Sequence, residues 1–304
     1  MTSTANGADT AAHAGKGPAV VALGGGHGLA ATLRAARGFA RSITGVVSVG
    51  DDGGSSGRLR AEFGVAPPGD VRRCISALAT EDTLLSRSLE YRFEQGVLTG
   101  HPVGNLLLAG LTMMSGDFQE AIDELCRAVG AVGSIFPATM VPVQLLADSD
   151  QGTMVGQVTI ERATGIRNLR FYPNDPPVAE CASRAVREAD QVVIGPGSLF
   201  TSVLAAAVVP GIRAALRESA GQRVFVANVA NEKGMARGFG LAEHIDALAD
   251  HGVKIDVVVA DSGSPSASGV GPPVIRADVA AGDGWGHDPA KLGRVLHQVY
   301  LERG

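Results

Sequence analysis

The chain has 304 residues and a formal net charge of −5, and no run of Lys or Arg stands out along it. A protein that binds nucleic acid over a broad surface normally carries a basic patch, so this class of function is disfavoured. Three cysteines, Cys74, Cys126 and Cys181, lie at no metal-ligand or redox spacing and predict reduced thiols in a cytoplasmic protein. No apolar stretch reaches the length of a membrane span without Gly, Pro or charge, so we expect no membrane anchor.

The first segment, residues 1–17, is rich in Ala, Gly, Ser and Thr and is predicted to be a disordered tail. Residues 18–304 contain no internal repeat and no clear linker. We therefore expect one α/β domain over that range.

The first half of this domain predicts strands that alternate with helices. Residues 19–23 and 43–49 are Val-rich runs that end in glycine, and Leu29, Leu33 and Ala36 recur between them at helical spacing. Strand, glycine loop, helix and strand in that order indicate a parallel sheet. Asp70 follows a Pro-Pro-Gly turn and is expected to cap a helix. The helices predicted in this half cover residues 71–79, 84–93, 105–114 and 118–129, the last with Asp117 at a capping position.

The middle of the chain breaks this alternation. Residues 140–147 and 153–160 are strand-like and are joined by a polar turn at 148–152, which predicts a β-hairpin inserted in the α/β pattern, and residues 166–172 predict another strand. The alternation then resumes. Strands are expected at 191–194, 224–227 and 255–260, and helices at 178–189, from 201 onward, at 242–249 and at 289–300.

Three glycine loops, each after a predicted strand, are the candidate site. Residues 24–28 are Gly-Gly-Gly-His-Gly, a loop that lets a helix N-terminus approach a phosphate, although it is neither a Walker A loop nor a regular dinucleotide fingerprint. Residues 51–58 place two acids before a Gly/Ser run and Arg58, and the acids could accept sugar hydroxyls or hold Mg²⁺. Ser55, Ser56 and backbone N–H groups could face phosphate, with Arg58 as the counter-charge. Residues 195–202 form the third loop. A tight turn, a solvated loop or simple helix caps would explain each loop alone, but one shared cleft explains all three.

These motifs resemble a known family. The stretches 23–29, 51–59, 67–72, 101–106 and 195–202 are similar to the YvcK family of gluconeogenesis factors and, more distantly, to 2-phospho-L-lactate transferase in the wider CofD-like group. The likeness covers about residues 19–299, and His287-Asp288-Pro289 shares it. Two positions depart from the family: His27 stands where many relatives carry Thr, and Met235-Ala236 replaces a Glu-Thr pair after Asn228, so the sugar contact is expected to differ.

The resemblance implies a three-layer Rossmann-like core, with a mostly parallel sheet and the hairpin insertion, in a cytoplasmic regulatory protein. YvcK-like proteins bind UDP-sugars, notably UDP-N-acetylglucosamine, and connect gluconeogenic carbon flow to peptidoglycan precursor supply and cell shape. The resemblance implies that no cofactor is required, although Mg²⁺ is a candidate. It implies a cell-wall precursor enzyme and a Ser/Thr kinase as protein partners, and it leaves open whether the protein is a homo-oligomer. The alternative is an Mg²⁺-dependent phosphotransferase that moves a phospholactyl group from a nucleotide donor to a deazaflavin alcohol. An NAD-dependent oxidoreductase fits less well, because the glycine spacing is wrong.

Loop position and family resemblance together nominate one set of nucleotide-binding residues and no catalytic residue. The set is Gly24, Gly25, Gly26, His27, Gly28, Asp51, Asp52, Gly53, Gly54, Ser55, Ser56, Arg58, Gly69, Asp70, Arg72, Asn105, Gly195, Pro196, Gly197, Ser198, Thr201 and Asn228. The candidate metal ligands are Asp51, Asp52 and Asp70.

Overall fold

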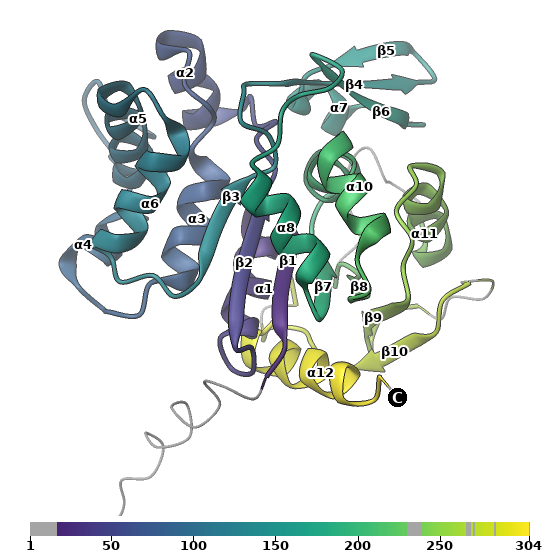
Figure 1. Cartoon of the computed structure of the whole chain (residues 1–304). Coiled ribbons are helices and arrows are strands. Elements are labelled where there is room, and N and C mark those ends of the chain that lie inside the picture. Colours follow the sequence, from purple (N-terminus) through teal and green to yellow (C-terminus); the bar gives the residue numbers. More distant parts are fainter. Residues whose placement is uncertain (1–16, 230–238, 266–268, 270, 283, 304) are drawn as a thin grey trace, which may run out of the picture.

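The computed structural model describes residues 17–229, 239–265, 269, 271–282 and 284–303 (Figure 1). The predicted N-terminal tail, apart from Gly17, lies outside these residues, and so does the Met235-Ala236 pair. The remaining elements form two sheets and the helices that cover them.

The larger sheet has seven strands in the order β10-β9-β8-β7-β1-β2-β3, and each pair of neighbours is parallel. The central strands β1 and β7 are buried apolar runs, as expected for a parallel sheet that is covered on both faces. The seven strands are β1 Ala19–Gly24, β2 Ser42–Val47, β3 Ser134–Pro137, β7 Gln191–Ile194, β8 Gln222–Val226, β9 Val257–Asp261 and β10 Val274–Ala277.

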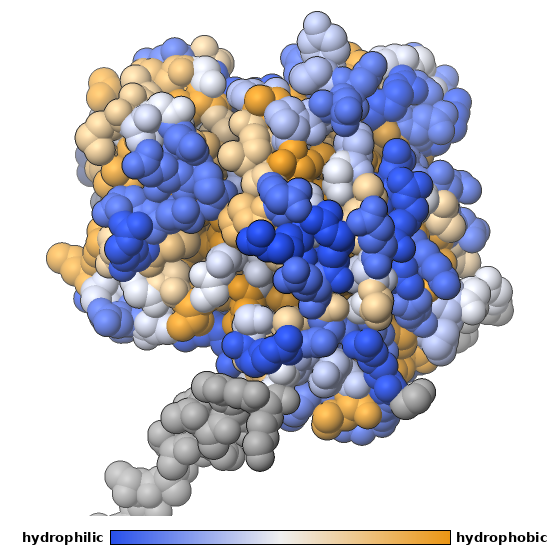
Figure 2. Space-filling model, in the orientation of Figure 1, coloured by the Kyte–Doolittle hydropathy of each residue, from blue (hydrophilic) through white to orange (hydrophobic). Residues whose placement is uncertain are grey.

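Helices pack against both faces of this sheet and give the three layers that the sequence predicts. Successive side chains of β1 alternate between two hydrophobic clusters, with Val20 and Ala22 in one and Val21 and Leu23 in the other. The first cluster is closed by α1 Gly26–Ala36, α3 Gly69–Leu78, α5 Val103–Ser115, α6 Phe118–Ala128 and α12 Pro289–Leu301. The second is closed by α8 Glu180–Glu188, the π-helix η1 Leu199–Leu204, α9 Ala205–Ala207, α10 Pro210–Glu218 and α11 Leu241–Asp250. Figure 2 shows hydrophilic residues over the outward side of α8, whose Ala182 and Val186 face the core.

The predicted hairpin is present as part of a second, antiparallel sheet with the order β5-β4-β6. Its strands are β4 Gln144–Ser149, β5 Gly152–Val155 and β6 Arg167–Tyr172. The prediction of a strand through residue 160 was wrong beyond Val155. Gly156 turns the chain at φ 89°, and residues Gln157–Arg162 form helix α7, where the backbone N–H of Val158 donates to Asp52 Oδ1 at 3.0 Å. In Figure 1 this small sheet lies beyond the carboxyl ends of β1 and β2.

Four other segments differ from the sequence-based expectation. Helix α4 covers only Leu84–Ser88, helix α2 (Gly54–Phe63) begins inside the predicted glycine loop, and strands β3 and β10 had not been predicted. The cap at Asp117 is confirmed, because its Oδ1 accepts from the backbone N–H of Gln119 at 2.7 Å and of Glu120 at 3.2 Å. Asp70 does not cap its own helix, since it lies in the first turn of α3 and Pro68 is the N-cap.

Within the described ranges no single helix is long and apolar enough to cross a membrane, although the bent pair Leu199–Ala207 and Pro210–Glu218, with 68° between its members, meets the length and composition criteria.

Candidate functional site

The three predicted glycine loops follow β1, β2 and β7, which are neighbours in the sheet, so they meet at one edge. The first and third loops touch backbone to backbone. A Cβ on Gly28 would lie 2.2 Å from the carbonyl oxygen of Pro196, and one on Gly197 would lie 3.7 Å from that of Gly25. No side chain fits between Gly28 and the third loop, which explains glycine at that position in packing terms.

The second loop ends at the N-terminus of helix α2. Gly53 is the N-cap and supplies no side-chain acceptor, and Gly54 opens the helix at φ 48° with open space around it. Among the described residues, none accepts a hydrogen bond from the backbone N–H groups of Gly54, Ser55 or Ser56. Three free N–H donors at the positive end of a helix dipole form a local anion-binding group.

Helix α1 begins in a similar way, since Gly26 has φ 63° and a Cβ there would enter open space. Its N-terminus is partly used inside the protein, however. The Asp70 carboxylate accepts from Arg73 Nη1 at 2.7 Å, and the nearby backbone of Gly26 also favours its charged form. A Cβ on Gly25 would lie 2.5 Å from Asp70 Oδ2, so this carboxylate lies directly against the first loop.

The two serines of the second loop point inward. Ser56 Oγ accepts from the backbone N–H of Gly69 at 3.1 Å, and both serines are buried. The two serines and the backbone N–H groups of this loop were predicted to face phosphate, but both hydroxyls form internal hydrogen bonds. The backbone N–H groups of the loop are the groups left for a ligand.

A buried chain of polar side chains holds Ser55 in place. Arg72 Nε donates to Asn105 Oδ1 at 3.0 Å, and this fixes the amide so that Asn105 Nδ2 donates to Ser55 Oγ at 3.0 Å. Ser55 Oγ is also 2.8 Å from His101 Nδ1. Desolvation, together with the charge of Arg58, lowers the pKa of His101, which favours the neutral ring that can accept the Ser55 proton.

Arg72, predicted to bind the nucleotide, is a buried support for this chain. Its side chain is only 2% exposed and forms an ion pair with Glu90, which is half exposed. Burial lowers the pKa of Arg72, and Glu90 opposes that effect. Arg58, which was expected to face phosphate, is exposed and donates from Nη2 to the carbonyl oxygen of Thr99 at 2.9 Å.

The three candidate metal ligands are not arranged alike. Asp51 accepts from the backbone N–H of Gly53 at 2.9 Å, and its Oδ2 would lie 3.3 Å from a Cβ on Gly69, beside Asp70. Burial raises the pKa of Asp70, Arg73 opposes the rise, and the charge of Asp51 adds to it. Asp52 is instead held against the start of α7.

In the described part of the chain no group of three or more His, Cys, Asp or Glu side chains could hold a metal ion. Asp51 and Asp70 form a pair of neighbouring carboxylates, and Mg²⁺ commonly uses one or two carboxylates together with substrate phosphates.

The third loop is clamped by Asn228. Gly197 N donates to Asn228 Oδ1 at 2.9 Å, and Asn228 Nδ2 donates back to the carbonyl oxygen of Gly197 at 3.1 Å. Gly197 has φ 144°, a value that L side chains rarely adopt. The following residues form the π-helix η1, a rare geometry that occurs often at functional sites. Ser198 is the N-cap residue of η1, but its side chain accepts no hydrogen bond from the helix. Helix capping by Ser198 therefore does not explain this loop.

Two side chains near these loops were absent from the predicted set. Glu161 Oε1 accepts from Thr201 Oγ1 at 3.1 Å, which ties helix α7 to η1. His287 Nε2 lies 3.1 Å from the carbonyl oxygen of Ala227, next to Asn228, and burial lowers its pKa. The His-Asp-Pro motif was a signal for His287, whereas Glu161 directly follows the strand predicted at 153–160 and gave none.

Comparisons with known proteins agree with this architecture. Residues 20–274 match the family model described as 2-phospho-L-lactate transferase CofD. A protein named gluconeogenesis factor from Halalkalibacterium halodurans is 42% identical over 246 residues, which cover 79% of this chain and 76% of that protein. A relative from Mycobacterium tuberculosis is 42% identical over 308 residues and covers 92% of this chain and 90% of its own length.

A solved structure of an upf0052 family member from Bacillus halodurans superposes with a TM-score of 0.86 at 34% identity, covering 91% of this chain and 97% of that one. The fold, the position of the glycine loops and the extent of these matches lead to one conclusion. The chain belongs to the CofD family, and within it to the group of gluconeogenesis factors.

Proposed function

We propose that this protein is a regulator that binds a nucleoside diphosphate sugar, probed first as UDP-N-acetylglucosamine, at the carboxyl edge of the large sheet. The observation that carries the proposal is the N-terminus of α2, where the N–H groups of Gly54, Ser55 and Ser56 have no acceptor among the described residues. The adjoining loops leave little room for other side chains, so a diphosphate can approach the backbone directly.

The uridine and the sugar follow from the resemblance of the loop motifs to YvcK-like proteins. The same resemblance supports a role in cell shape, in directing gluconeogenic carbon to peptidoglycan precursors, and in contacts with a cell-wall precursor enzyme or a Ser/Thr kinase. The Asp51 and Asp70 carboxylates fit a Mg²⁺ ion held together with the ligand phosphates, since a cation would relieve the repulsion between the two charges. The ion would neutralise phosphate charge.

A matched set of glycine substitutions tests the phosphate site. Gly26, Gly54 and Gly64 all have φ between 48° and 70° with open space around them, and Asn tolerates this left-handed region better than most residues. Gly26 and Gly54 open helices at the proposed site, whereas Gly64 is the C-cap at the other end of α2. We expect Gly26→Asn and Gly54→Asn each to weaken UDP-N-acetylglucosamine binding at least tenfold in calorimetry, and Gly64→Asn to leave it unchanged.

The ligand and its fate are tested on the wild-type protein. UDP-N-acetylglucosamine should raise the melting temperature in a saturable way, UDP alone should raise it less, and no product should form with Mg²⁺. Equal binding by all three Asn variants would remove the helix N-termini from the site. Steady Mg²⁺-dependent transfer from a guanosine-linked phospholactyl donor to a deazaflavin alcohol would replace the regulator with the transferase.

A further inference from the structure

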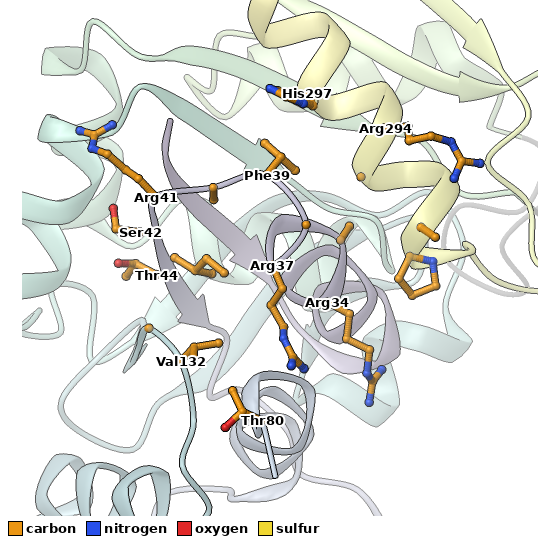
Figure 3. A pocket seen from close by; sticks show the side chains of 18 of the residues that line it. Arg34, Arg37, Phe39, Arg41, Ser42, Thr44, Thr80, Val132, Arg294 and His297 are labelled. Carbon is orange, nitrogen blue, oxygen red and sulfur yellow. The ribbon is translucent and has the colours of Figure 1, made fainter. Parts of the chain in front are cut away.

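A second hollow lies at the opposite, amino edge of the sheet. It is a cavity of about 970 Å³ between the C-terminal end of α1, the loop that leads into β2, the start of β3 and the first half of α12 (Figure 3). Ser42 and Thr44, at the beginning of β2, lie in its wall, whereas the glycine loops follow the ends of the strands. The cavity is therefore separate from the candidate nucleotide site.

The charge of this cavity is the opposite of the charge of the whole protein. The chain carries 31 acidic against 26 basic side chains, yet among the described residues four arginines line the cavity and no Asp or Glu does. Figure 3 shows the guanidinium groups of Arg34, Arg37, Arg41 and Arg294 around it, contributed by three different segments. These guanidinium groups lie at separate places around the rim and point in different directions, and together they raise the positive potential of the hollow.

Two of these arginines are already used for the fold. Arg37 Nη1 donates to the carbonyl oxygens of Ala77 and Ala79, each at 3.1 Å, at the C-terminal end of α3. Arg41 forms an ion pair with Asp190. Arg37 therefore adds positive potential without a negative partner, and the charge of Arg41 is largely neutralised.

The other two arginines are free to bind a ligand. Arg34 and Arg294 are exposed, and neither forms a hydrogen bond or an ion pair with any residue the structure describes, although the Asp288 carboxylate is close enough to interact with the charge of Arg294. Each guanidinium offers five N–H donors in a planar fork that matches phosphate or carboxylate oxygens. The hydroxyls of Ser42 and Thr44, in the cavity wall, can add neutral donors.

We propose that this cavity binds a small, multiply charged phosphate-bearing anion, held by Arg34 and Arg294. A volume of about 970 Å³ lies at the upper end of the range for small-molecule sites and exceeds what one phosphate fills, so a ligand larger than a single phosphate fits, and the arginines favour one with several negative charges. The proposal concerns a site distinct from the carboxyl edge and does not depend on the nucleotide-sugar assignment.

Inorganic tripolyphosphate is a suitable probe for this site, because it carries several phosphates and no base or sugar. We would titrate it by calorimetry into the full chain at two salt concentrations, and follow the ring signals of His297, which stacks on Phe39 in the cavity wall, by NMR. The test variant is Arg34→Gln/Arg294→Gln. The matched control is Arg184→Gln/Arg217→Gln, which removes the same charge from two exposed arginines on α8 and α10 that form no hydrogen bond or ion pair with any described residue.

We expect tripolyphosphate to shift the His297 signals in the wild type and in the control variant, and the test variant to bind at least tenfold more weakly. Equal affinity in the two variants, or binding without a change at His297, would overturn the proposal. So would a response to a polyglutamate peptide with none to tripolyphosphate, because that would make the cavity a docking surface for an acidic protein segment. Unchanged melting temperatures of both variants would establish that folding is intact.

Discussion

Removing the buried guanidinium of Arg72 should both destabilise the protein and loosen the second glycine loop. Arg72→Met is the cleanest change, because methionine keeps much of the stem whose Cγ and Cδ pack against Gly104. The variant strands one buried acceptor, Asn105 Oδ1, while the contact with the Leu89 carbonyl oxygen is already long at 3.5 Å. Glu90 is half exposed and can be hydrated again, so its loss of a partner adds little.

A stranded buried acceptor costs about 1–3 kcal/mol, and relief from burying the guanidinium offsets part of this cost. We therefore expect Arg72→Met to lower the free energy of unfolding by about 1–3 kcal/mol in urea denaturation, with an unchanged m-value. Arg72→Ala should cost more, since it adds a cavity beside Gly104. A change below about 0.5 kcal/mol in Arg72→Met, the range of ordinary surface substitutions, would refute the role assigned to the buried chain.

Three further predictions test other contacts. Desolvation opposes ionisation of Glu90, but the charge of Arg72 holds the pKa of Glu90 below its usual value. The pair therefore stabilises the fold at a pH above that usual value, and this stability is lost as the pH falls through the pKa of the folded protein. Glu90→Gln should flatten the fall of unfolding free energy at acid pH, and an unchanged slope would count against the pair. Asn228→Asp can still accept from Gly197 N but cannot donate to its carbonyl oxygen, so UDP-N-acetylglucosamine affinity should fall at least tenfold in calorimetry, and wild-type affinity would separate the clamp from binding. Asp52→Ala should lower the free energy of unfolding by about 1 kcal/mol, because the contact with the first turn of α7 is lost. Asp52→Asn should retain most of that contact and lose less stability. Equal losses for the two variants in urea denaturation would contradict a role of Asp52 in holding α7.

The central strands could be predicted because each is a short run of buried apolar residues bounded by glycine or polar residues. The segments that were missed depend on contacts made from elsewhere. Val158 and Ile160 favour a strand by composition, but Asp52, more than a hundred positions away, accepts from the first turn of α7 and a helix forms. Strands β3 and β10 have four residues each, too few to show a clear period, and both lie at the edges of the sheet.

The candidate site shows a similar division. The position of the three glycine loops follows from strand order, which the βαβ pattern indicates. The direction of each polar side chain does not follow from the local sequence. Ser55 turns inward because His101 and Asn105, from a segment about fifty residues later, reach its hydroxyl. The Gly/Ser composition of the loop indicated an anion site, but it could not show that the backbone N–H groups rather than the hydroxyls stay free.

Helices α1 and α3 are tied to each other at both ends. At the carboxyl edge, the Asp70 carboxylate in the first turn of α3 lies against the loop that begins α1, since a Cβ on Gly25 would be 2.5 Å from its Oδ2. At the amino edge, Arg37, just after α1, donates to the last carbonyl groups of α3. Contacts at both ends should favour movement of the two helices together. The N–H groups of both helices should then exchange with solvent in a single cooperative opening, and any anion that shifts the tip of one helix must carry the other with it.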